Sequence, residues 1–222
     1  MKKRNYSDKK ATRFTFNQLR VFNMILITEP DFIPDEEKFI NAFFNEGLEI
    51  LYLRKPEATA LQMHELISKI DEKFHSKIMI HSHYELLDTF QLRGLHFTEK
   101  SKEQIRSYEK IKCEKSLAVH ELSDLKCVDN SIDYVFLSPL FTSVSKVGYS
   151  KQWNFGLLKA ELSSHRNFKV IALGGITLDN VKLVRKIGFD DFALLGSIWE
   201  PVKAGHSLSE TVKNFNRFQN EK

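Results

Sequence analysis

Residues 169–197 constrain the fold more than any other part of this sequence. They read as an apolar run, two glycines, a helical segment, a second apolar run and a further glycine. Neither run alternates with polar residues, which is typical of parallel strands covered by helices. In a (β/α)₈ barrel the loops after strands seven and eight commonly bind phosphate through backbone N–H groups and a helix N-terminus. The predicted ligands of a phosphate monoester are Gly174, Gly175, Gly196 and Ser197.

The same alternation of apolar strand and helix extends back to residue 21. Six earlier strands are predicted, each followed by a helical segment, at 21–28, 50–54, 77–82, 94–98, 116–120 and 133–138. The helices are predicted at 35–46, 59–74, 84–91, 102–109, 122–128, 155–162, 179–187 and 207–219. A doubly wound open sheet usually has fewer strands and a glycine loop after its first strand. Here Thr28, Glu29 and Pro30 follow the first strand, so the sequence predicts a single (β/α)₈ TIM barrel.

Charge is distributed unevenly along the 222 residues. Residues 1–23 hold seven basic residues and one acid, a net charge of +6 against +4 for the whole chain, so the remainder carries −2. A barrel without basic excess argues against a nucleic-acid surface. Residues 1–22 are predicted to be a disordered basic extension or an upstream start, with Met24 as the true beginning; an organellar leader or a nucleic-acid-binding arm stays open. Residues 23–222 are predicted to form the barrel domain.

Other features of composition narrow the class of protein. No apolar run approaches the roughly 20 residues of a membrane-spanning helix. Cys113 and Cys127 are too few and too far apart for a thiol metal site, which favours reduced thiols in a cytoplasmic protein. The expected partner is a phosphorylated small molecule, with no nucleic acid and no membrane. The oligomeric state stays open, with a homo-oligomer among the alternatives.

Active sites of such barrels gather at the carboxyl ends of the strands. The polar residues expected there are Thr28, Glu29, Arg54, Lys55, His81, Ser82, His83, His96, Thr98, His120 and Ser138. The loop after the sixth strand, residues 141–149, is rich in hydroxyl groups and carries Lys146. This loop is predicted to be a lid over a phosphorylated ligand.

Several of these segments also match a known pattern in order and spacing. They are Leu-Tyr-Leu-Arg at 51–54, Gly-Leu-His at 94–96, Ala-Val-His-Glu at 118–121, the segment 133–146 and Ile-Ala-Leu-Gly-Gly-Ile at 171–176. Together they resemble the thiamine phosphate synthase/TenI family over roughly residues 24–200. The synthases of that family join an aminopyrimidine diphosphate to a thiazole phosphate, whereas TenI-type members aromatise a thiazole carboxylate phosphate.

The resemblance implies roles for individual residues of this chain. Gly174, Gly175, Gly196 and Ser197 would hold the thiazole phosphate. Thr142, Ser143, Ser145 and Lys146 resemble the phosphate-contacting Thr-x-Thr-Lys stretch of the synthases. Arg54 matches an arginine that meets anionic ligand groups, although an ion pair between Arg54 and Glu29 is the structural alternative.

The departures from the family pattern concern its metal site. Ser82 and Ser101 stand where the synthases carry aspartates, and Lys55-Pro56 replaces the second cation of an Arg-x-Lys motif. Mg²⁺ needs hard oxygen ligands, and a diphosphate leaves poorly unless cations neutralise its growing charge. No metal site and no cofactor are therefore expected, with Mg²⁺ required only if the chain is a synthase. Glu99 is the one nearby acid that can replace the missing ligands.

The histidines supply candidates for a general base, because imidazole titrates near neutral pH. His81 and His120 are preferred, each with a rim hydrogen bond as its structural alternative. A metal centre of His81, His83, His96 and His120 is disfavoured because no carboxylate completes it. His64, His75, His165 and His206 are expected to face solvent. The tautomerase histidine of the TenI branch is replaced by Pro139, so that reaction needs another base.

Three functions remain after these comparisons of residues. The preferred one is a TenI-like thiazole tautomerase in thiamine biosynthesis, with His81, His120 and Arg54 as its catalytic residues. The first alternative is a divergent thiamine phosphate synthase with a rewired metal site. The second is a catalytically silent binder or regulator that keeps the phosphate loops.

Overall fold

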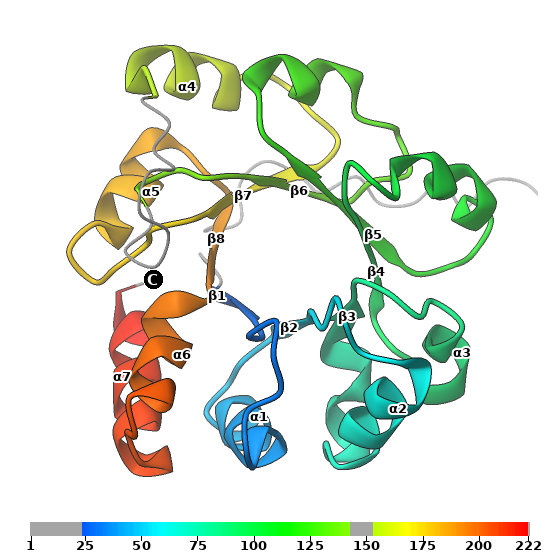
Figure 1. Cartoon of the computed structure of the whole chain (residues 1–222). Coiled ribbons are helices and arrows are strands. Elements are labelled where there is room, and N and C mark those ends of the chain that lie inside the picture. Colours follow the sequence, from blue (N-terminus) through cyan, green and yellow to red (C-terminus); the bar gives the residue numbers. More distant parts are fainter. Residues whose placement is uncertain (1–23, 143–152, 222) are drawn as a thin grey trace, which may run out of the picture.

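The computed structural model describes residues 24–142 and 153–221, and their central feature is a closed barrel of eight parallel strands (Figure 1). The barrel closes where β1 pairs with β8, with Ile25 opposite Ala193. The strands are β1 (Met24–Ile27), β2 (Ile50–Leu53), β3 (Ile78–Ile80), β4 (Gly94–Phe97), β5 (Glu114–Val119), β6 (Tyr134–Leu137), β7 (Lys169–Leu173) and β8 (Asp191–Leu194). The predicted TIM barrel is confirmed.

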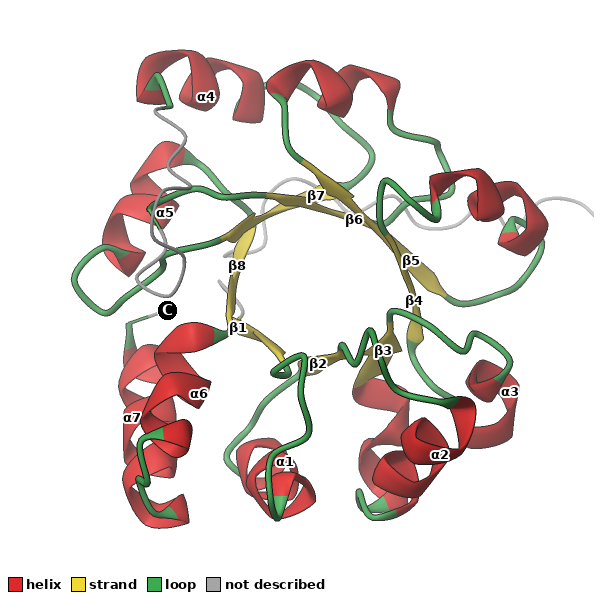
Figure 2. Ribbon diagram, in the orientation of Figure 1, coloured by secondary structure: helices red, strands yellow, loops and turns green. Residues whose placement is uncertain are grey.

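Helical segments surround the barrel on its outside (Figure 2). The α-helices are α1 (Glu36–Asn45), α2 (Ala60–Ser68), α3 (Leu86–Phe90), α4 (Phe155–Leu162), α5 (Val181–Ile187), α6 (Gly196–Lys203) and α7 (Leu208–Asn220). Three 3₁₀ helices complete the set in the described residues, namely η1 (Glu72–Lys77), η2 (Lys102–Tyr108) and η3 (Leu122–Cys127). No helix within the two described ranges is long and apolar enough to cross a membrane.

The helix predicted at 59–74 is interrupted. The last turn of α2 tightens, because the N–H groups of Lys69 and Ile70 bond to carbonyls three residues earlier. His75 explains why the chain turns back here, since its Nε2 lies 3.1 Å from the Ile67 carbonyl and 3.0 Å from the Ile70 carbonyl. The expectation that His75 faces solvent is wrong, because this role buries it at 8% exposure.

Two apolar layers hold the barrel together. Side chains inside the barrel, among them Ile27, Tyr52, Met79 and Phe136, form one cluster. A larger cluster fills the space between the strands and the surrounding helices. Burying both faces of the strands accounts for their continuous apolar runs.

Helix α6 directly after β8 was not predicted from the sequence. Its Trp199 is fully buried, stacks edge-on against Phe43 of α1, and donates a hydrogen bond from Nε1 to the Ile27 carbonyl at 2.8 Å. This contact joins the last part of the barrel to its first strand.

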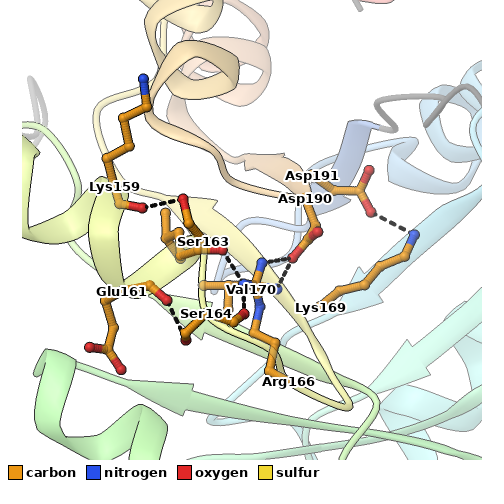
Figure 3. Close-up of polar contacts among 10 residues, drawn as sticks. Lys159, Glu161, Ser163, Ser164, Arg166, Lys169, Val170, Asp190 and Asp191 are labelled. Carbon is orange, nitrogen blue, oxygen red and sulfur yellow. Dashed lines mark hydrogen bonds and ion pairs between the residues drawn. The ribbon is translucent and has the colours of Figure 1, made fainter. Parts of the chain in front are cut away.

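The amino ends of the strands carry a network of ion pairs (Figure 3). Arg166 donates to Asp190 at 2.5 Å and to the Leu162 carbonyl, while the Asp190 carboxylate also accepts from the backbone N–H of Val170 at 2.8 Å. At the start of the same two strands, Lys169 of β7 lies 3.1 Å from Asp191 of β8. This end of the barrel is therefore fastened by side chains that pair with one another.

Candidate functional site

The glycine loop after β7 is tightly shaped by its surroundings. Gly174 has φ +101° and Gly175 has φ +64°, which favours glycine at both positions. A Cβ on Gly174 would lie 2.9 Å from Pro139 Cα, and one on Gly175 would lie 2.6 Å from the Thr142 carbonyl oxygen. Both positions therefore need glycine for conformation and for space.

The segment after β6 packs directly on this loop. The N–H of Leu140 donates to the Leu173 carbonyl at 2.8 Å, and the N–H of Phe141 donates to the Gly174 carbonyl at 3.0 Å. Predicted ligand Thr142 thus lies next to Gly175. The other predicted loop residues, Ser143, Ser145 and Lys146, lie outside the described residues, as does most of the predicted lid.

The second half of the predicted phosphate site is the start of α6. Gly196 and Ser197 form its first turn, where backbone N–H groups have no acceptor within the helix and the helix dipole favours an anion. The Ser197 hydroxyl donates to the Ile176 carbonyl, which ties this turn to the glycine loop. Asn214 of α7 donates to the Ser197 carbonyl at 2.8 Å and so holds the turn from the other side.

Lys55 does not take part in the site. Its side chain is completely buried, and Nζ lies 2.7 Å from Glu36 Oε2, 2.8 Å from the Glu29 carbonyl and 2.7 Å from the Asp31 carbonyl. Burial raises the pKa of Glu36 and lowers that of Lys55, while their attraction opposes both shifts. The cation that follows Arg54 in sequence therefore holds the loop between β1 and α1.

Arg54 directly follows β2 and lies at the carboxyl end of the barrel, which is called the mouth from here on. Its backbone N–H donates to Thr28 Oγ1 at 2.9 Å, but its guanidinium makes no ion pair with any residue that the structure describes. The alternative pairing with Glu29 is not formed, because Glu29 bonds to Lys203 at 3.1 Å. Arg54 is thus a half-buried positive charge that is not neutralised by a described carboxylate.

His81 and His96 lie against each other inside the mouth, with ring centroids 4.2 Å apart and ring planes tilted by 38°. Burial and the charge of Arg54 lower the pKa of His96 to about 3, and burial, His96 and Arg54 together hold the pKa of His81 well below its ordinary value. Both rings are therefore neutral at pH 7. Nδ1 of His96 lies 2.9 Å from Ser116 Oγ, whereas Nε2 of His81 is buried without a partner in residues 24–142 and 153–221.

His120, the other predicted base, is exposed at the end of β5. Its Nδ1 lies 2.8 Å from the Ser138 carbonyl, which can only accept a hydrogen bond. The proton of a neutral His120 therefore sits on Nδ1, and the lone pair sits on Nε2. His81 is a poor proton acceptor, because a pKa held well below its ordinary value makes a weak base.

The donors at the mouth do not fit Mg²⁺. No three His, Cys, Asp or Glu side chains of the described residues are placed to hold a metal ion together. Ser82 and Ser101 are neutral, and Ser101 Oγ already accepts from the Thr98 N–H at 2.8 Å. Glu99 is 73% exposed and lies 3.9 Å from Lys102. Hard anionic ligands of the kind that Mg²⁺ prefers are thus missing from this donor set.

A closed parallel barrel with glycine loops after β7 and β8 and polar groups at the strand ends has the architecture on which phosphate-binding enzymes are commonly built. The family model "Thiamine monophosphate synthase" matches residues 24–198. The chain therefore belongs to this family of thiamine-biosynthesis enzymes, and the predicted membership is confirmed.

Named relatives cover most of the chain. The thiamine-phosphate synthase of Geobacillus thermodenitrificans is 25% identical over 180 residues, covering 78% of this chain and 79% of the relative. That of Alkaliphilus oremlandii is 22% identical over 209 residues, covering 89% and 99%. The crystal structure of a thiamine phosphate pyrophosphorylase from Bacteroides thetaiotaomicron has a TM-score of 0.77 and 29% identity, covering 90% of this chain and 97% of that chain. These names support an enzyme, and they favour the synthase alternative over the tautomerase preferred from the sequence.

Proposed function

We propose that this chain is a thiamine-phosphate synthase that joins an aminopyrimidine diphosphate to a thiazole phosphate. The observation that carries the proposal is the match to relatives of that name over most of both chains. The tightly packed loops at Gly174, Gly175 and α6 support it, because they present main-chain donors where a thiazole phosphate would bind.

The reaction makes a simple demand on the site. A bond forms between the thiazole nitrogen and the pyrimidine methylene carbon, and the bond from that carbon to the diphosphate oxygen breaks. The diphosphate leaves with the electron pair, so positive charge near it stabilises the transition state. Among the described residues at the mouth, Arg54 can supply that charge, and Lys146 of the sequence is a second candidate.

A thiazole tautomerase is the second candidate function. It is favoured by the neutral side chains of Ser82 and Ser101, which are poor ligands for Mg²⁺, since a proton transfer within one ring needs no divalent cation. In that reaction His120 is the better candidate for the base, with the lone pair on Nε2, and Arg54 would meet the ring carboxylate. A silent thiazole-phosphate binder is the outcome that remains if neither reaction occurs.

The deciding experiment measures thiamine phosphate from aminopyrimidine diphosphate and thiazole phosphate, once with Mg²⁺ and once with EDTA. Product in either buffer supports the synthase. Absence of product, together with an ultraviolet change on the thiazole carboxylate phosphate tautomer, would replace it by the tautomerase. Calorimetric binding of thiazole phosphate without either turnover would identify a binder. The same assay is run on Arg54→Gln, which removes the cation at the mouth. Its matched control is Arg106→Gln, which removes an exposed cation from η2.

A further inference from the structure

Two sets of polar groups at the mouth lie on opposite sides of the barrel. In the closed order of eight strands, β3 stands four places from β7, so the two lie across the barrel from each other (Figure 1). The glycine loop follows β7, whereas Arg54 follows β2, and His81 and Ser82 follow β3. A ligand, or a pair of ligands, that fills the mouth therefore meets both sets.

The set on β2 and β3 contains polar atoms that the protein leaves unsatisfied. His81 Nε2 and Ser82 Oγ are buried and have no hydrogen-bond partner among the described residues. Leaving buried polar groups unpaired costs free energy, so a ligand that pairs with these atoms would form hydrogen bonds that the protein itself does not supply. β2 and β3 pair with Leu53 opposite Ile80, so Arg54 and His81 are the next residues of neighbouring strands. The positive charge of Arg54 contributes to lowering the pKa of both His81 and His96.

The chemistry of this set suits an anion. Arg54 carries a permanent positive charge, a serine hydroxyl can donate, and a neutral imidazole with its proton on Nε2 can donate as well. No described carboxylate pairs with Arg54, because Glu29 is bonded to Lys203 and Glu36 to Lys55. An anion at this place can therefore accept hydrogen bonds from Arg54, Ser82 and His81. It does not have to displace a described carboxylate from Arg54.

We propose that Arg54, His81 and Ser82 form an anion site that binds its ligand directly, without a bridging divalent cation. Ser82 is central to this difference, since a hydroxyl stands where a carboxylate would recruit a metal ion. The bound group is an anionic oxygen group at the end of the substrate opposite the thiazole phosphate. It is a diphosphate if the chain is a synthase and a ring carboxylate if it is a tautomerase, so the identity of the anion rests on the proposed function, whereas the metal independence does not.

The test observes His81 directly in the wild-type protein. The ring signals of the eight histidines are recorded by NMR in EDTA, and His81 is assigned from the spectrum of His81→Gln. Inorganic pyrophosphate and thiazole-2-carboxylate are the two probes, each added with inorganic phosphate present to occupy the glycine loops. A saturable shift of the His81 signals with pyrophosphate identifies the diphosphate form of the site, and one with thiazole-2-carboxylate identifies the carboxylate form.

Variants then measure what each group contributes. Arg54→Gln and Ser82→Asp are each expected to weaken metal-free binding of the responding probe about 10-fold, since each removes a charge-assisted donor or adds a like charge. His81→Leu is expected to weaken it about 10-fold and His81→Gln less than about 3-fold, because glutamine keeps a donor. Arg106→Gln should leave the dissociation constant within about 2-fold, since this exposed cation lies outside the mouth.

Two results would overturn the proposal. One is a His81 signal that does not move with either probe in EDTA, and the other is a shift that appears only when Mg²⁺ is added. Neither depends on turnover, so a failed synthase assay with a positive His81 titration would reject the proposed function and keep the anion site. Thermal melting of each variant shows whether the protein is still folded, and so whether a loss of binding comes from the removed group or from unfolding.

Discussion

The two ends of the barrel differ in how their charged side chains are paired. At the amino end, Arg166 pairs with Asp190, Lys169 with Asp191, and Arg93 forms two hydrogen bonds to Glu114 at 2.6 and 2.8 Å. At the carboxyl end, Arg54 lacks a described ion-pair partner, and buried atoms of His81 and Ser82 are unsatisfied. The first arrangement stabilises the fold, and the second leaves interactions for a ligand.

Lys55 shows that a charged residue at the carboxyl end of the barrel is not always left for a ligand. It stands next to Arg54 at the carboxyl end, yet its ammonium group is buried against Glu36 and two carbonyls. The carboxyl end therefore also contains a structural support, which shapes the loop between β1 and α1. Mutations at the two neighbouring cations should separate stability from ligand binding.

The largest effect on ligand binding is expected from Gly175→Ala. The new Cβ would meet the Thr142 carbonyl oxygen at 2.6 Å, so the loop must move, and thiazole phosphate should bind about 100-fold more weakly as measured by calorimetry. Gly205→Ala is the control, because its φ of +94° is equally left-handed but its Cβ would contact nothing within 4 Å. Equal loss of affinity in both variants would contradict the role of close packing.

The largest effect on stability is expected from Lys55→Met. It leaves the buried carboxylate of Glu36 without its partner, which should lower the free energy of unfolding by about 3–5 kcal/mol in a denaturant titration. Lys38→Met breaks an exposed pair with Asp35 and should change it by less than about 1 kcal/mol. If both variants lose the same free energy of unfolding, the buried ion pair stabilises the fold no more than the exposed one does.

An intermediate effect is expected from acid. The pKa of His96 is lowered to about 3 in the folded protein, so the unfolded state binds more protons between that value and about 6.5. Stability should therefore be complete above pH 6.5 and fall as the pH drops toward 3, with His81 adding in the same direction. The free energy of unfolding of wild type and of His96→Gln is measured at pH 7 and at pH 5. If the difference between the two pH values is the same in both proteins, His96 is not a source of the pH dependence.

The smallest effect is expected at the amino end. Arg93 and Glu114 are 23% and 34% exposed, so a double-mutant cycle with Arg93→Gln and Glu114→Gln should give a coupling of about 1 kcal/mol. The affinity for thiazole phosphate should stay within about 2-fold, because the pair lies at the opposite end of the barrel from the glycine loops. A large loss of affinity would show that the two ends are not independent.

Much of the fold could be predicted because each strand and helix carries a local signal. Phe155–Leu162 is helical over the predicted residues, and the glycines after β7 have the positive φ values that their loop requires. The burial of Lys55 could not be predicted, since its partner Glu36 belongs to another element. The low pKa of His81 could not be predicted either, since it results from burial and from the neighbouring His96 and Arg54. Side-chain direction at strand ends is thus set by tertiary packing, which a single sequence does not reveal.

The pairing of β1 with β8 has a consequence for how the chain is made. One edge of β1 is satisfied early by β2, where Ile25 lies opposite Ile50, but its other edge waits for residues 192–194. Trp199, which bonds to the Ile27 carbonyl, arrives later still. During synthesis the first strand therefore keeps an open hydrogen-bonding edge until most of the chain has emerged, and the barrel closes among the last steps of folding. Quenching or shift of the Trp199 fluorescence would time that closure.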